Sequence, residues 1–411
     1  MRSKYFQRTV ATGSAVLIFA GLVYAQDGST RPRRVNAPSN VSRVEDSTPT
    51  ASRENAAGTS PTPGANVSAP RGNATGSRDT SHAYSLLQQK QYAAAAREAK
   101  QIAAADPNNV EAWKIAGFAE FNLKQYEEAG ADLQRALDLQ RAAAQEDANT
   151  IDALAQAYVL TEKFDRALPL LVTATTRKGA TADAVMLYYR GIAEYRTGKS
   201  VEAERSFNAA VKANPKDAAS LYYLGQLAVA RNDLDAAVSA LNRATQNDPR
   251  LAQGWALLTS VYLRRAAQAS GPKADADYLN AVRAGEALTR IKTDADAAML
   301  YGQALIGAKQ YARAATALER AAAGEQAKGP AIYLLGVAYS RAENFPKAIA
   351  ALERAAAKSP DDVNVYRELG YAYEVSKQYA KALAAYQKGA ALAPADTSFK
   401  ESIERVQPFA K

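Results

Sequence analysis

A pattern of small, aromatic and aliphatic residues recurs every 34 residues over much of this chain, and no other feature restricts its fold as strongly. Each unit has a small residue, often Gly, then an aromatic residue or Leu nine positions later, Ala three further on, and often a closing Pro. Three successive units place the small residue at Gly302, Gly336 and Gly370. Their matching positions are Tyr311, Ala314, Leu318 and Ala321; Phe345, Ala348, Leu352 and Ala355; and Tyr379, Ala382 and Tyr386. Such a period indicates an array of repeated units rather than a single growing core.

The spacing within each unit predicts a pair of antiparallel helices. Gly or Ala at facing positions lets the two helices approach closely, and the larger residues fill the remaining space. The aromatic residue lies at the turn between the helices, and the closing Pro ends the second helix. One hairpin cannot cover its own apolar face, so about nine stacked hairpins between residues 81 and 394 are expected to supply the core. Alanine contributes much of the 47% hydrophobic content, which also favours an all-α fold.

The pattern resembles the tetratricopeptide repeat family over residues 81–394. The resemblance implies a right-handed superhelical solenoid of about nine helix-turn-helix repeats. Residues 395–411 are predicted to form a capping helix, over 397–406, and a tail, because solenoids need a polar-faced end. The sixth unit carries an extra segment over 267–275 that contains Gly271-Pro272, which predicts a long loop or an extension of the helices at one edge.

Residues 1–25 have the layout of a secretory signal peptide. Basic residues at positions 2, 4 and 8 precede an apolar stretch over 10–24, and cleavage is predicted after Ala25. The stretch is shorter than the roughly 20 apolar residues that span a bilayer; the alternative is an uncleaved anchor in the inner membrane that faces the periplasm. Residues 26–80 are rich in Ser, Thr, Pro and Gly and contain no aromatic residue, so they are predicted to be a disordered linker. The chain is therefore expected to be periplasmic or secreted.

The composition excludes many kinds of catalytic and metal site. The chain has no Cys and a single His, His82, so disulfides, thiol nucleophiles, zinc sites of His and Cys, and His-dependent triads within the repeats are ruled out. A pair of Asp or Glu side chains remains able to act as general acid and base. The net charge of +9 suggests a polyanionic partner, but both signs are mixed along the predicted helices, which is typical of a solvated surface. No cofactor and no metal is expected.

In the family that the pattern resembles, the first helix of each repeat lines a concave groove. The resemblance places in this groove Phe118, Phe121, Tyr188, Tyr195, Tyr222, Gln226, Gln303 and Tyr333. Tyr is favoured in recognition surfaces because its ring offers broad contact and a polar tip at a low entropic cost. The alternative is that these rings pack between neighbouring first helices. Arg196, Arg264 and Arg341 recur at the thirteenth place of alternate units, where they form either a positive edge for an acidic peptide or part of a solvated surface.

Together these features predict a non-catalytic scaffold in the bacterial cell envelope, which binds partner proteins or peptides in its groove as part of an assembly or export machine. The link to such a machine is an analogy, because one fold serves many processes. Two other classes stay open. One is an envelope-associated glycan-binding or carboxylate-based enzyme module, which needs carboxylates or aromatic rings clustered in one pocket. The other is a polyanion or nucleic-acid binder, whose binding would fall steeply with added salt.

Overall fold

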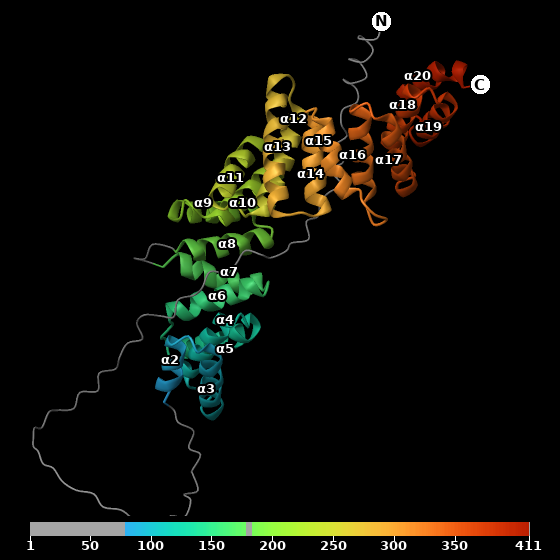
Figure 1. Cartoon of the computed structure of the whole chain (residues 1–411). Helices are drawn as coiled ribbons and strands as arrows, with labels where there is room; N and C mark the ends of the chain where they lie inside the picture. The colour runs from blue at the N-terminus through green and yellow to red at the C-terminus, as the bar shows by residue number, and fades with distance from the viewer. Residues whose placement is uncertain (1–78, 178–182, 411) are drawn as a thin grey trace, which may run out of the picture. The chain divides into compact units, whose positions relative to one another are not determined.

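The computed structural model describes residues 79–177 and 183–410. All regular elements among these residues are helices, which confirms the predicted all-α fold (Figure 1). The described residues divide into two compact units, an N-terminal unit over 79–213 and a C-terminal unit over 214–410, and each is considered by itself. The predicted signal peptide and nearly all of the predicted linker lie outside the described residues.

The N-terminal unit contains, within its described residues, eight helices arranged as four hairpins. These are α2 (Ser81–Gln88) and α3 (Tyr92–Ala105), α4 (Val110–Asn122) and α5 (Tyr126–Ala142), α6 (Ala148–Leu160) and α7 (Phe164–Thr175), and α8 (Ala184–Arg196) and α9 (Ser200–Ala213). Each helix packs against the next along the chain, and each first helix also contacts the first helix of the following hairpin. This is the nearest-neighbour packing of a helical repeat array.

The C-terminal unit contains five hairpins among its described residues (Figure 1). These are α10 (Ala218–Ala230) and α11 (Leu234–Asn247), α12 (Ala252–Gln268) and α13 (Pro272–Ile291), α14 (Ala295–Gly307) and α15 (Tyr311–Ala321), α16 (Gly329–Arg341) and α17 (Phe345–Lys358), and α18 (Val363–Val375) and α19 (Tyr379–Leu392). Helix α20 (Thr397–Val406) and the short 3₁₀ helix η1 (Gln407–Phe409) pack on α19. Helix α20 covers the residues for which the sequence predicts a closing helix, and Phe399 fills its buried face at 1% exposure.

Glycine in a first helix makes room for one large residue of the second helix. A Cβ atom at Gly302 would lie 2.4 Å from Leu318 Cγ, and one at Gly336 would lie 2.6 Å from Leu352 Cγ. Both leucines are fully buried, so they have no space into which to move. The expectation that small residues permit close helix approach is confirmed in these hairpins.

The turn inside most hairpins contains one residue with a left-handed backbone. Outside the sixth hairpin, that residue is glycine only at Gly198, where φ is 79°. The other hairpins, except the sixth, use residues with φ between 57° and 65°, namely Lys90, Lys124, Glu162, Asn232, Lys309, Glu343 and Lys377. This conformation costs a residue with a Cβ atom about 1 kcal/mol, so the packing of the two helices must offset it.

In four repeats a tyrosine at the eleventh place ties the first helix to the second helix of the preceding repeat. The pairs are Tyr158 with Gln134 (2.8 Å), Tyr262 with Asn242 (3.0 Å), Tyr339 with Glu319, and Tyr373 with Glu353. All four tyrosines are less than a tenth exposed. Their rings therefore belong to the interface between repeats. At the edge of this interface, each hydroxyl group forms a hydrogen bond with a polar side chain of the preceding repeat.

Of the two alternatives that the sequence leaves open for residues 267–275, a long loop or an extension of the helices, the sixth repeat has the extension. Helix α12 continues to Gln268 and α13 begins at Pro272, so three residues connect two extended helices. Gly271 takes a φ of 63°, and Pro272 has a fixed φ that suits the first helical position. Arg265 donates to both carboxylate oxygens of Asp277, at 2.8 and 2.6 Å, which joins the extended ends. The inserted residues therefore lengthen the hairpin.

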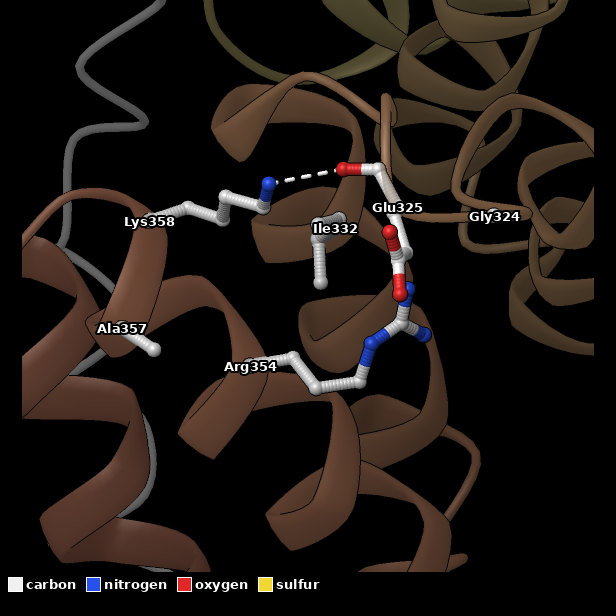
Figure 2. A pocket seen from close by; sticks show the side chains of 6 residues that line it. All are labelled: Gly324, Glu325, Ile332, Arg354, Ala357 and Lys358. Carbon is white, nitrogen blue, oxygen red and sulfur yellow. Dashed lines mark hydrogen bonds between the residues drawn. The ribbon is translucent and has the colours of Figure 1, made fainter.

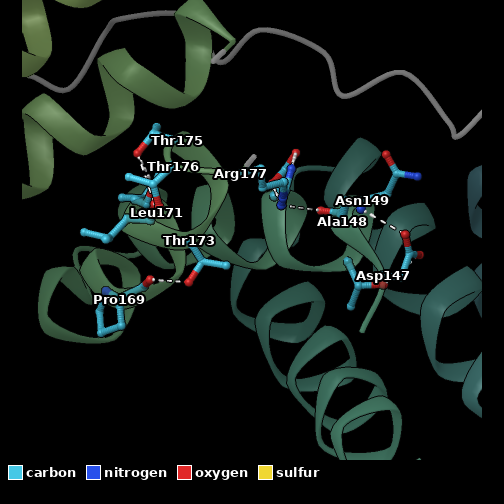
Figure 3. Close-up of polar contacts among 12 residues, drawn as sticks. Asp147, Ala148, Asn149, Pro169, Leu171, Thr173, Thr175, Thr176 and Arg177 are labelled. Carbon is cyan, nitrogen blue, oxygen red and sulfur yellow. Dashed lines mark hydrogen bonds and ion pairs between the residues drawn. The ribbon is translucent and has the colours of Figure 1, made fainter. Parts of the chain in front are cut away.

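The third repeat lacks the closing proline that follows the first and fourth repeats, and it has Pro169 inside α7. Thr173 Oγ1 donates to the Pro169 carbonyl oxygen at 3.0 Å (Figure 3). Just beyond the end of α7, Arg177 donates to the Ala148 carbonyl oxygen at 3.1 Å (Figure 3). Arg177 also forms an ion pair with Asp152. A charged side chain thus fastens the end of this second helix to α6.

Candidate partner-binding surface

Phe118 and Phe121 of α4 do not line a groove. Their side chains are 2% and 4% exposed, and the Phe121 ring meets the Tyr126 ring edge-on at a centroid distance of 5.3 Å. The reason is that α4 is packed by α2, α3, α5 and α6, which together bury most of its length. These two rings pack between helices, which was the alternative prediction. They are therefore not part of the candidate surface.

Tyr188 and Tyr195 of α8 are partly exposed. They are seven residues apart, so they lie on the same face of the helix. The adjacent Tyr189 is buried at 5% exposure, because successive residues on a helix point in different directions. The Tyr188 ring contacts the rings of Tyr189 and Phe207 at centroid distances of 5.4 and 6.2 Å. Tyr188 therefore joins the core on one side and offers a face to solvent on the other.

In the C-terminal unit, Tyr222 and Gln226 lie one turn apart on α10 and are partly exposed. Gln226 Nε2 donates to the Tyr222 hydroxyl oxygen at 2.7 Å. Gln303 is partly exposed on α14. These three side chains lie on first helices as predicted, but they form no single pocket.

Of the two alternatives for the arginines at the thirteenth place, the positive edge does not fit Arg196 and Arg341. Arg196 Nη2 donates to Glu162 Oε1 at 3.2 Å, and Arg341 makes a two-pronged pair with Glu368. Arg264 of α12 is partly exposed and also interacts with neighbouring groups. Glu162 lies in the turn between α6 and α7, and Glu368 lies on the next first helix, α18. These carboxylates already compensate the charges of Arg196 and Arg341.

Four side chains form a polar cluster on two neighbouring first helices of the C-terminal unit, which we call the α16–α18 cluster: Tyr333 and Arg341 of α16, and Glu368 and Tyr371 of α18. Arg341 Nη1 and Nη2 donate to Glu368 Oε2 and Oε1 at 2.9 and 2.8 Å. The guanidinium carbon lies 5.9 Å from the centroid of the Tyr371 ring. Paired charges and a cation–π contact hold these side chains in fixed positions.

The electrostatics of the α16–α18 cluster keep its two tyrosines protonated and its arginine charged. Burial raises the pKa of Tyr333, and the nearby Glu368 carboxylate acts in the same direction. Burial likewise raises the pKa of Tyr371. Burial acts to lower the pKa of Arg341, but attraction to Glu368 and the hydrogen bonds to it outweigh burial, so that pKa is raised. The cluster presents neutral hydroxyl groups beside a compensated ion pair.

A second charged group, the Lys100 cluster, lies inside the N-terminal unit and consists of Lys100 (α3), Glu120 (α4) and Asp132 (α5). The two acids are 3% and 7% exposed, and Glu120 Oε2 and Asp132 Oδ2 are buried without a hydrogen-bond partner among the described residues. Lys100 Nζ contacts the other Glu120 oxygen and lies 3.6 Å from Asp132 Oδ2. Burial raises the pKa of both carboxyls, that of Glu120 to about 7. Two acids thus share one cation where a substrate has no access.

The structure offers no sign of metal chemistry in the parts that it describes. Across 79–177 and 183–410, no group of three or more His, Asp or Glu side chains is placed to hold a metal ion. None of the helices in these ranges is both long and apolar enough to cross a membrane.

Sequence reasoning missed the partner of Arg341 and the buried acid pair. Glu368 lies 27 residues from Arg341, and nothing in the repeat pattern distinguishes it from a solvated acid. A signal was present for Glu120, which occupies the eleventh place, where four other repeats carry a buried tyrosine. An acid at a core position indicates a buried charge that needs a partner.

The geometry defines a protein of stacked helical hairpins whose first helices carry partly exposed aromatic rings. A family model for the tetratricopeptide repeat matches residues 80–147, 188–252 and 333–397. A model described as anaphase-promoting complex, cyclosome, subunit 3 matches residues 274–355. This chain is a tetratricopeptide repeat protein. Its repeats indicate that it is a scaffold for protein–protein interaction. No curated protein matches the chain significantly.

Solved structures of tetratricopeptide repeat proteins are similar to this chain at low identity. YrrB, described as a TPR protein with an unusual peptide-binding site, is 19% identical over 49% of this chain and 99% of its own, with a TM-score of 0.40. The C-terminal part of a TPR repeat-containing protein from Cytophaga hutchinsonii is 15% identical over 71% and 99%, with a TM-score of 0.44. MamA from Desulfovibrio magneticus RS-1 is 20% identical over 41% and 92%, with a TM-score of 0.36.

Proposed function

We propose that this chain is a non-catalytic scaffold that holds partner proteins or peptides on the exposed faces of its first helices. The observation that supports this is a set of partly exposed tyrosines on those helices: Tyr188, Tyr195, Tyr222, Tyr333 and Tyr371. The tyrosines at the eleventh place are instead buried and bonded to the preceding repeat. Tyrosines of the first kind keep part of their ring surface exposed for contact with a partner.

The α16–α18 cluster is the part of this surface with the best-defined chemistry. The hydroxyl groups of Tyr333 and Tyr371 form no hydrogen bond with another described residue, and their raised pKa values keep them protonated. Arg341 and Glu368 compensate each other beside them. A partner segment with apolar side chains and neutral acceptors, such as backbone carbonyl groups, suits this surface. Its binding is expected to depend only weakly on salt, unlike that of a polyanion.

We also propose that the scaffold acts in the cell envelope. This rests on the signal-like residues 1–25 and the linker-like residues 26–80, both read from the sequence. Mass spectrometry of the N-terminus of protein isolated from the periplasmic, membrane and cytosolic fractions tests the proposal. A mature chain that begins at Gln26 in the periplasmic fraction supports export with cleavage; an intact Met1 in the cytosolic fraction contradicts it.

Site-specific photocrosslinking tests the binding surface. The full chain carries a benzophenone amino acid at position 371 and, as the matched control, at Tyr311, a partly exposed tyrosine at the start of the second helix α15. A discrete protein adduct is expected from position 371 in envelope extract, and none from position 311. The adduct should disappear in a folded Tyr333→Ala variant.

Binding of the identified partner is then compared between the parent, Tyr333→Ala, Tyr371→Ala and Tyr311→Ala. Loss of an aromatic anchor at the centre of an interface should weaken binding roughly tenfold or more. The surface assignment fails if Tyr311→Ala weakens binding as much as the other two changes, or if adducts form only at position 311.

A further inference from the structure

A second feature of the C-terminal unit, separate from the tyrosine surface, is a hollow between the second helices α13 and α15, with α14 behind it. Its volume is about 340 Å³, and we call it the α13–α15 hollow. It is lined by Thr289, Ala298, Tyr301, Arg313, Thr316, Ala317 and Arg320. Two arginines and three hydroxyl groups line this hollow, and no carboxylate does.

The two arginines of the hollow are bonded only to neutral acceptors. Arg313 donates to the Tyr301 hydroxyl oxygen at 2.8 Å and to Gln310 Oε1. Arg320 Nη2 donates to the Thr293 carbonyl oxygen at 3.4 Å, which is a long hydrogen bond. Neither forms an ion pair with a residue in the described ranges, whereas Arg265 of the same unit pairs with two carboxylates.

The acids on the neighbouring helices already have partners of their own. Glu286 pairs with Arg290 at 2.8 Å, Asp296 with Lys328 at 2.7 Å, and Asp294 with Lys292 at 2.9 Å. The positive charges of the two hollow arginines are therefore uncompensated. Guanidinium groups bind carboxylate and phosphate oxygens in two-pronged pairs, so such a hollow attracts an oxyanion.

A comparable hollow two helices further along shows that this arrangement is not a general property of the repeats. It is lined by Gly324, Glu325, Ile332, Arg354, Ala357 and Lys358 (Figure 2). Lys358 donates to the Glu325 carbonyl oxygen at 2.7 Å, and Arg354 to the Ala322 carbonyl oxygen at 2.9 Å. Here the cations fasten a connection between repeats, and the Glu325 carboxylate supplies the opposite charge to the lining.

We propose that the α13–α15 hollow binds a small oxyanion with two acidic groups, either phosphate or carboxylate. Arg313 and Arg320 are seven residues apart on α15, so their Cα atoms are separated by about 10 Å along the helix. Each guanidinium pairs with one acidic group of the ligand. The Tyr301 hydroxyl accepts from Arg313 and keeps its own proton to donate to the nearer group. Ala298 and Ala317 leave the space that the ligand fills.

Isothermal titration calorimetry of the chain tests the proposal with inorganic pyrophosphate and with citrate, in separate titrations at constant ionic strength. Saturable binding of pyrophosphate alone identifies a phosphate ligand, and saturable binding of citrate alone identifies a carboxylate ligand. Binding of both shows that the hollow accepts either class. Arg313→Gln and Arg320→Gln should each weaken binding roughly tenfold or more. Arg313 is exposed at the start of α15, so its variant is expected to fold and to carry the test if Arg320→Gln does not.

Arg354→Gln is the matched control. Arg354 occupies the same repeat position as Arg320 and also donates to a carbonyl oxygen of the preceding repeat, so it shares the structural role. It lines the other hollow, whose lining includes the Glu325 carboxylate, and not the α13–α15 hollow. Its replacement should leave the affinity unchanged. The proposal is overturned if neither probe binds at millimolar concentration, or if Arg354→Gln weakens binding as much as Arg313→Gln.

Discussion

Replacing Glu120 by Gln is expected to stabilise the N-terminal unit above pH 7 and to remove most of its pH dependence between pH 5 and 8. Glu120 is 3% exposed and shares one cation, Lys100, with the buried Asp132. When both acids ionise, one buried negative charge has no counterion, and such a charge is unfavourable. Burial accordingly raises the pKa of Glu120 from 4.5 to about 7.

The sign and size of the effect follow from this shift. Between pH 4.5 and 7 the native state holds a proton that the unfolded chain has released, so the free energy of unfolding falls as the pH rises. One pKa unit corresponds to about 1.4 kcal/mol, so the loss between pH 5 and 8 is about 3 kcal/mol at most. Asp132 is shifted in the same direction. The carboxyls with lowered pKa, such as Asp147 and Asp294, titrate below this window.

Urea denaturation followed by tryptophan fluorescence can measure this loss of stability in the N-terminal unit alone. The chain has two tryptophans, Trp113 in α4 and Trp255 in α12. A Trp255→Phe background therefore leaves a single probe on the helix that carries Glu120. The free energy of unfolding is compared at pH 5, 6, 7 and 8 with Glu120 intact, with Glu120→Gln, and with Glu128→Gln, an exposed acid on α5.

Glu128→Gln should keep the pH profile of the background, and Glu120→Gln should flatten it. A background whose stability is constant or rises from pH 5 to 8 refutes the reasoning. A Glu120→Gln variant that retains the full slope refutes it as well, because the proton would then belong to another group. Flattening by both changes would assign the effect to net charge.

Further predictions concern packing, the repeat turn and metal independence. Gly302→Ala should lower the free energy of unfolding by about 1–3 kcal/mol, because the new Cβ would lie 2.4 Å from the Leu318 side chain, whereas Gly130→Ala, with its nearest atom at 3.5 Å, should not destabilise. Equal urea curves for the two would contradict this. Tyr339→Phe removes the bond to the preceding repeat and should cost about 1 kcal/mol in urea denaturation followed by the fluorescence of Trp255, which lies in the same unit. Lys377→Gly, at a φ of 60°, should stabilise by up to about 1 kcal/mol, and a decrease would show that strain is absent. A chelator should leave the circular dichroism melting curve unchanged, since the described residues contain no metal-ligand group.

Much of the fold was predictable because its determinants repeat along the sequence. Gly302 and Leu318, 16 residues apart, report a close helix contact, and the same spacing returns in Gly336 and Leu352. The repeat also marks which helix of each hairpin is the first, and so which tyrosines lie on the helices that form the candidate surface. These features depend on contacts within one hairpin or between adjacent hairpins, which a pattern with a 34-residue period records.

The candidate site was only partly predictable, because the same place in the repeat has different surroundings in different repeats. Phe118 and Tyr188 were assigned to one surface, yet Phe118 is buried and Tyr188 keeps an exposed face. Arg341 was predicted to belong either to a positive edge or to a solvated surface, but Glu368 on the next first helix compensates its charge. In the sixth repeat the extra residues extend two helices, since Arg265 and Asp277 pair across their ends.

The sequence alone determined the all-α fold, the hairpin repeat, the close contacts at glycine and the absence of cysteine chemistry, because each depends on residue identity and short-range spacing. Only the tertiary structure decided which rings are exposed, which arginines remain uncompensated and where two acids share a cation. Burial and charge pairing depend on side chains from at least two elements that converge in space. The cost of burying a charged side chain and the gain from pairing it both depend on these neighbours, so neither follows from the position of one residue in the repeat.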